Sequence, residues 1–155
     1  MTPYQFDIDA VVSVLNRILQ AEISGILRYT HYSFMVFGPD RIPIITWLRE
    51  QAAESLLHAH QVGELITHLG AHPTLNVTPL KESHKHDTMS ILKESLAHEV
   101  EALNLYRELL ELVKDKSIMI EEFARSQICE EEKHTGEVEK MIGNPGLVAS
   151  GESCC

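Results

Sequence analysis

Glutamate and histidine side chains recur in this chain at spacings that suit metal coordination. Glu54 and His58 are four residues apart, and Glu131 and His134 are three residues apart. On a helix, either spacing brings the two side chains to one face. Carboxylate oxygens combined with imidazole nitrogens suit iron or manganese, so the two pairs are candidate metal ligands.

Two further glutamates interrupt apolar stripes. Glu22 follows Leu15 and Ile18 at the helical steps of three and four, and Glu99 follows Leu92 and Leu96 in the same way. This periodicity assigns both acids to a core. Isolated carboxylates are costly to bury, because each loses its hydration and like charges repel. Two divalent cations would neutralise four carboxylates, so we expect a site for two metals.

The acids also repeat at one separation. Three pairs of residues lie 77 positions apart: Glu22 with Glu99, Tyr29 with Tyr106, and Glu54 with Glu131. The chain is therefore interpreted as two copies of a helical hairpin. Only the histidines break the repeat, since His58 follows its glutamate by four residues and His134 by three.

The apolar periodicity predicts four long helices, over residues 7–37, 43–69, 87–113 and 117–142. No segment alternates as a strand would. The connections within each half are short, whereas residues 70–86 form a long connection, and about 15 extended residues reach roughly 50 Å. We therefore expect an all-α, up-down-down-up four-helix bundle over residues 1–142, with a crossover between the second and third helices. Residues 143–155 are expected to be a flexible tail.

The composition agrees with a single globular domain. The chain has 155 residues, of which 44% are hydrophobic and 23% charged. Its net charge of −10 argues against a nucleic-acid partner. No apolar run predicts a membrane span, and the first residues do not resemble a signal peptide, so a cytoplasmic protein is expected. The three cysteines, Cys129, Cys154 and Cys155, do not form a disulfide framework; we expect Cys129 to be packed.

These motifs resemble the ferritin-like superfamily, and within it bacterioferritin most closely. Glu131-Glu132-Lys133-His134 matches the family's Glu-x-x-His element of the fourth helix. The segment 15–19, followed by Glu22 and Tyr29, is similar to the family's first helix, and segment 54–59 is similar to its second-helix tract. The resemblance covers most of residues 5–142.

The resemblance implies a ligand set for two iron ions, with manganese as a possible alternative. Glu22 and Glu99 would be terminal carboxylate ligands, and Glu131 would bridge the two metals. His58 and His134 would each bind one metal.

Two tyrosines accompany the predicted ligands. Tyr29 and Tyr106 are candidate redox-active neighbours of the metals. The alternative is that they are core aromatic residues that cap the site, since a buried tyrosine often donates its hydroxyl to a nearby polar group.

The chain departs from the family pattern in three places. Ser55 stands three residues before His58, where the family has a bridging glutamate, and the acid is one residue earlier, at Glu54. The repeat favours Glu54 as the ligand; the alternative is an altered, asymmetric or single-metal site. Leu56 replaces the family's haem-ligating methionine, so haem is not supported. No fifth helix follows Met141, which puts a 24-subunit shell in doubt.

The family relation implies an Fe(II)-oxidising protein, a ferroxidase, that uses O2 or H2O2 in iron storage or detoxification. One alternative is a peroxide-reducing protein resembling rubrerythrin, although the usual Cys-x-x-Cys pair is absent. Another is a non-catalytic metal-binding relative. We expect a homo-oligomer, at least a dimer.

Three of the histidines that lie outside the predicted centre are His84, His86 and His98. We expect His98 to lie to the side of the metal site. His84 and His86 in the crossover belong either to a solvated loop or to a point where metal enters.

Overall fold

The computed structural model describes residues 4–143, which form four helices and no strand. The helices are α1 (Ile8–Met35), α2 (Arg41–His68), α3 (Thr88–Val113) and α4 (Ile118–Ile142). Their ends lie within two residues of the predicted ones. The all-α four-helix fold is therefore confirmed. Most of the predicted tail, including Cys154 and Cys155, lies outside the described residues.

Three of the helices begin at a capping side chain. Asp7, Asp87 and Ser117 each accept a hydrogen bond from the backbone N–H three residues later, at 3.1, 2.9 and 3.4 Å. Such a cap satisfies one of the N–H groups that a helix leaves unpaired at its start. These local signals fix where α1, α3 and α4 begin.

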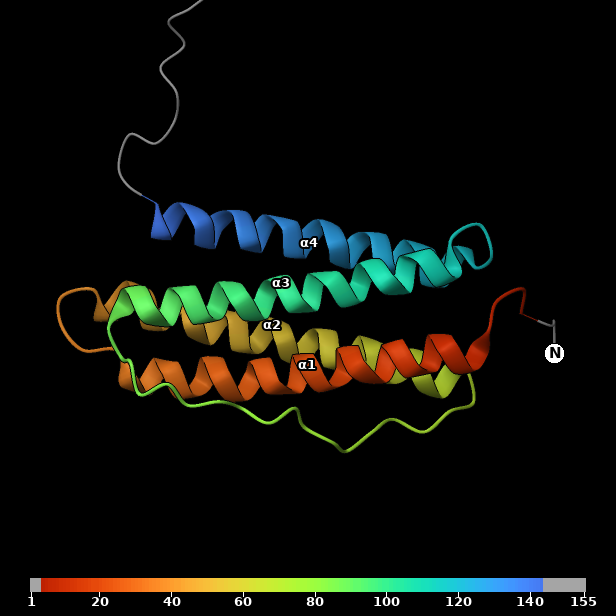
Figure 1. The fold of residues 1–155 in the computed structure, drawn as a ribbon, viewed down its shortest axis with the longest axis horizontal. Helices are drawn as coiled ribbons and strands as arrows, with labels where there is room; N and C mark the ends of the chain where they lie inside the picture. Colours follow the sequence, from red (N-terminus) through yellow and green to blue (C-terminus); the bar gives the residue numbers. More distant parts are fainter. Residues whose placement is uncertain (1–3, 144–155) are drawn as a thin grey trace, which may run out of the picture.

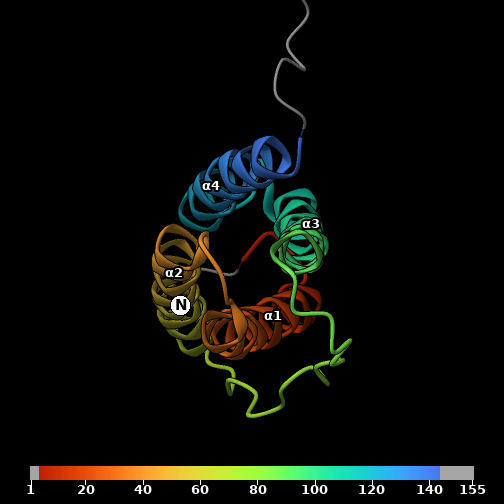
Figure 2. The same ribbon diagram turned by 90° about the vertical axis from the view of Figure 1, so that its left-hand side faces the viewer.

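The helices are arranged as two antiparallel hairpins joined by the crossover. α1 packs against α2 and α3, and α3 packs against α4. The crossover runs back along the outside of α1 for the whole length of the bundle (Figure 1). There Thr74 N–H donates to Asn16 Oδ1 at 2.8 Å, and Ser24 Oγ donates to Thr78 O at 3.5 Å. The end view shows the four helices around a common axis (Figure 2).

The core consists of two apolar clusters with a polar layer between them. One cluster includes Val11, Ile18, Val62 and Ile120, and the other is centred on Leu48 and neighbouring side chains of α1, α2 and α3. Fully burying an aliphatic side chain of this size contributes about 1.5–3 kcal/mol. The buried carboxylates occupy helix positions between the two clusters, so apolar packing above and below them holds the polar layer in place.

By length and composition alone, α1 is apolar enough to cross a membrane. In the bundle, 44% of its most apolar window is buried against the other helices. Core helices of globular bundles can be equally long and apolar, so this property is weak support for a membrane span.

Candidate metal centre

Each of the four helices contributes a buried ligand-type side chain to the polar layer. Glu22 comes from α1, His58 from α2, Glu99 from α3 and Glu131 from α4, and none is more than 6% exposed. His134, one turn beyond Glu131, is half-buried. The structure thus brings together five of the six predicted ligands at the middle of the bundle.

Glu131 lies between two groups of potential ligands. Its Oε1 is 3.4 Å from His58 Nδ1, and that nitrogen is also 3.4 Å from Glu22 Oε1. Its Oε2 is 3.7 Å from His134 Nδ1. The donor atoms of Glu22, His58 and Glu131 lie within 4.8 Å of one another, and so do those of Glu99, Glu131 and His134. A carboxylate shared by both groups could contact two cations at once.

The two tyrosines bind the terminal carboxylates in a reciprocal pattern. The Tyr106 hydroxyl donates to Glu22 Oε1 at 2.6 Å, and the Tyr29 hydroxyl donates to Glu99 Oε1. Each tyrosine therefore contacts the glutamate of the other hairpin. The arrangement follows from the 77-residue repeat, and it fixes the orientation of both carboxylates.

The charges in this layer are balanced by protons when no metal is bound. Burial raises the pKa of Glu22 and of Glu99. Burial would lower the pKa of His58, but its hydrogen bonds to Glu131 and Glu22 outweigh that effect and raise it to about 10. For Glu131 burial acts to raise the pKa, and the facing His134 and His58 reverse the effect, so the pKa is lowered. Glu131 is thus a buried anion that faces the imidazoles of His58 and His134.

One oxygen of this anion lacks a hydrogen-bond partner. Glu131 Oε2 is buried, and no donor is within hydrogen-bonding geometry. Leaving such a group unsatisfied costs about 1–3 kcal/mol, and more when it is charged. A cation coordinated by this oxygen would remove that cost. The donor set and the unsatisfied oxygen both fit a metal ion at this position.

The sixth predicted ligand, Glu54, lies at the margin of the cluster. Its side chain is 36% exposed, and its Oε2 is 3.2 Å from His134 Nε2. Ser55 occupies the buried position instead, 8% exposed. Ser55 and Glu131 both stand three residues before a histidine, so α2 and α4 correspond spatially at a separation of 76 residues. The position that corresponds to Glu131 in α2 therefore has no carboxylate.

Glu130 was missed as a candidate. It is half-buried, and one of its carboxylate oxygens lies within 4.8 Å of ligand atoms of Glu54 and His134. The i,i+4 relation between Glu130 and His134 was a sequence signal for this proximity.

Two other expectations concern residues near the centre. His98 lies to the side, with its ring centroid 5.9 Å from that of Tyr29, and burial lowers its pKa to about 4. The expectation that Cys129 is packed was wrong: it is exposed, because it falls on the solvent side of α4.

A four-helix bundle with glutamates and histidines from all four helices in its core defines the ferritin-like di-iron carboxylate class. The sequence profile of the ferritin-like domain matches residues 12–147. The chain therefore belongs to the ferritin-like family.

Solved structures with the same fold have low sequence identity to the chain. A ferritin-like di-iron carboxylate protein from Bacillus anthracis has a TM-score of 0.83 at 22% identity, over 88% of this chain and 97% of that one. The dodecameric, bacterioferritin-related thioferritin of Bacteroides fragilis has a TM-score of 0.80 at 21% identity, over 88% and 86%. Rhodobacter capsulatus bacterioferritin has a TM-score of 0.74 at 26% identity, over 85% and 82%. No curated protein matches the sequence significantly.

Proposed function

We propose that this protein binds two Fe(II) ions in the polar layer and oxidises them, as a ferroxidase in iron storage or detoxification. The observation that carries the proposal is Glu131: a buried carboxylate, shared by two groups of donors, with one oxygen that has no hydrogen-bond partner. Iron is the substrate, and manganese would suit the same donors.

In this proposal the donors divide into two positions. Glu22 and His58 bind one Fe(II), Glu99 and His134 bind the other, and Glu131 bridges them. Glu54 serves as a further ligand on the His134 side, because its carboxylate is already next to that imidazole at 3.2 Å. Tyr29 and Tyr106 hold the terminal carboxylates in position through their hydroxyl groups.

The redox reaction balances with either oxidant. Two Fe(II) ions lose one electron each, and O2 takes up the two electrons and two protons to give H2O2. With H2O2 as the oxidant, the two electrons and two protons yield two water molecules. The carboxylates favour Fe(III) over Fe(II), because the attraction between opposite charges grows with the charge of the cation.

Anaerobic Fe(II) titration followed by addition of oxygen tests the proposal. We expect two Fe(II) per chain and, after oxygen, a near-ultraviolet absorbance that rises until both are oxidised. Binding without accelerated oxidation, relative to buffer, would contradict the ferroxidase role and favour a metal-binding relative. The same titration with H2O2 and a reductant distinguishes the rubrerythrin-like alternative, which turns over repeatedly.

Ser55 favours a variant of this function in which the two metal positions bind iron with unequal affinity. Because no carboxylate lies at that buried position, the two metal positions are unequal: Glu22 and His58 are buried, whereas the side chains of His134 and Glu54 are 17% and 36% exposed. A site that retains one iron tightly and the second weakly is the alternative that this asymmetry favours.

We also propose that the protein is a homo-oligomer. Phe34 of α1, and Leu56 and Leu57 of α2, are between 44% and 59% exposed. Large exposed apolar side chains on two helices that pack against each other favour a subunit interface. Sedimentation velocity should show a dimer or a larger particle, and a monomer at micromolar concentration would contradict this.

A further inference from the structure

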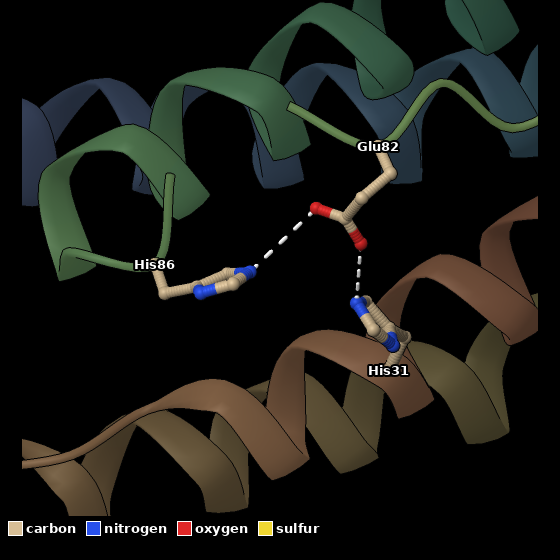
Figure 3. A group of neighbouring side chains, drawn as sticks. All are labelled: His31, Glu82 and His86. Atoms are coloured by element: carbon tan, nitrogen blue, oxygen red, sulfur yellow. Dashed lines mark ion pairs between the residues drawn. The ribbon is translucent and has the colours of Figure 1, made fainter. Parts of the chain in front are cut away.

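A second group of metal-ligand side chains lies on the outside of the bundle. His31 belongs to α1, and Glu82 and His86 belong to the crossover (Figure 3). His31 Nε2 is 2.7 Å from Glu82 Oε2, and His86 Nε2 is 3.6 Å from Glu82 Oε1. One oxygen of the carboxylate thus faces each of the two imidazoles (Figure 3).

The backbone of the crossover orients this group. His84 adopts a left-handed conformation, with φ of 56°, which is uncommon for residues other than glycine. Its N–H donates to Glu82 Oε1 at 2.8 Å. The turn brings Glu82 and His86 to one side of the crossover, next to His31 of α1. The three donors are therefore positioned by segments that are more than 50 residues apart in sequence.

The donor set has the composition of an open transition-metal site. One donor atom from each of the three residues lies within 4.8 Å of the others. Ligands about 2.0–2.2 Å from a zinc ion are roughly 3.3–3.5 Å apart in tetrahedral geometry, so small side-chain rotations suffice. Two imidazoles and one carboxylate with solvent access form the three-ligand pattern of open zinc and iron sites.

Solvent can reach the group through a groove. His31 and Glu82 line it together with Leu27, Arg28, Leu80 and Lys81. Arg28 of α1 donates to the Tyr32 hydroxyl at 2.8 Å, and no ion pair joins it to Glu82. Among the described residues, the side chains that pair with the Glu82 carboxylate are the imidazoles of His31 and His86.

We propose that His31, Glu82 and His86 bind one divalent first-row transition-metal ion, with water completing its coordination. The site is separate from the centre of the bundle, because no residue is common to the two. A bound ion would link the crossover to α1 and would hold the start of α3 in place. The proposal does not depend on iron oxidation by the bundle.

Zn2+ binding to the full chain tests the proposal. Isothermal titration of the wild type should give one more Zn2+ equivalent than titration of His31→Gln or His86→Gln. Loss of a direct ligand should weaken this site by at least about 100-fold, since even an outer-shell partner is worth 10–100-fold. His72→Gln, which changes an exposed histidine at the start of the same crossover, is the matched control and should bind like wild type.

Hydrogen exchange locates the ion. Zn2+ should slow amide exchange in residues 80–87 of the wild type and of His72→Gln, but not of His31→Gln. The proposal is overturned if the Zn2+ stoichiometry of His31→Gln equals that of wild type, or if Zn2+ does not change the rate of amide exchange in residues 80–87 of the wild type. Iron oxidation measured on the same variants should be unchanged, so failure here is distinguishable from failure of the proposed function.

Discussion

The Glu54 carboxylate lies 3.2 Å from His134 Nε2, while the next residue, Ser55, occupies the buried position in α2. In the first hairpin Glu54 therefore lies at the edge of the centre, whereas in the second hairpin Glu131 lies in its middle. The two halves of the repeat are equivalent in their tyrosine–glutamate bonds and unequal in their bridging positions.

Replacement of Glu131 should weaken metal binding at the centre of the bundle. Glu131→Ala removes the carboxylate common to both donor groups, so we expect at least about 100-fold weaker Fe(II) binding, more than for an outer-shell change. The fold should persist, because the apolar clusters on either side of the polar layer are unchanged. Anaerobic Fe(II) titration and circular dichroism measure the two effects. Glu132→Ala, at an exposed neighbouring position, is the control. Equal Fe(II) stoichiometry in both variants would contradict the assignment of Glu131 as a ligand shared by the two metals.

Replacement of Glu54 should affect one metal more than the other. Glu54→Gln keeps the shape of the side chain but removes its charge beside His134. We expect the weaker Fe(II) site to lose about 10-fold or more in affinity, while the Glu22–His58 position is retained. The test is a two-site fit of the titration, with Glu50→Gln on the exposed side of α2 as the control. Equal weakening of both sites would argue against a local role for Glu54.

Removal of one tyrosine hydroxyl should slow oxidation without loss of metal. Tyr106→Phe deletes the 2.6 Å hydrogen bond to Glu22 and leaves the ring packed. We expect two Fe(II) per chain, several-fold slower oxidation by stopped-flow absorbance, and about 1–2 kcal/mol lower stability of the metal-free protein. If Tyr106 instead exchanges electrons with iron, a tyrosyl radical signal should appear in wild type and vanish in the variant.

The metal-free protein should lose stability as the pH rises above neutrality. In the folded chain the pKa of His58 is raised to about 10, from an ordinary value of 6.5. A raised pKa means that the folded state binds the proton more tightly, so its stabilising effect is complete below about pH 6.5 and is lost towards about pH 10. The pKa of His134 is raised as well and acts in the same direction.

Urea unfolding of the chelator-treated protein measures this dependence. We expect a fall on the order of a few kcal/mol between about pH 6.5 and about pH 10, and a flatter profile for His58→Gln. Because a metal competes with these protons, Fe(II) binding near pH 7 should release protons and tighten as the pH rises. A wild-type profile as flat as that of the variant would contradict the ionised state assigned to His58.

Much of the centre could be predicted from sequence because its signals are local. Helical periodicity placed Glu22 and Glu99 in the core, and the Glu-x-x-His spacing singled out Glu131 and His134. The 77-residue repeat also matched Tyr29 with Tyr106, whereas the bond from each tyrosine to the glutamate of the other hairpin was found only in the structure. The sequence did not predict which residue of α2 faces the core. Adjacent residues of a helix are rotated by about 100° about its axis, so the packing of α2 decided that Ser55, and not Glu54, points to the interior.

The sequence by itself determined the four helices, the long crossover and the types of ligand available to a metal. Those features depend on periodicity and residue chemistry, which act within one or two turns of chain. Only the tertiary structure decided that Ser55 is buried, that Glu54 contacts His134, and that His31 lies beside Glu82. These relationships join separate segments, and only the packing of those segments against one another brings the side chains within reach.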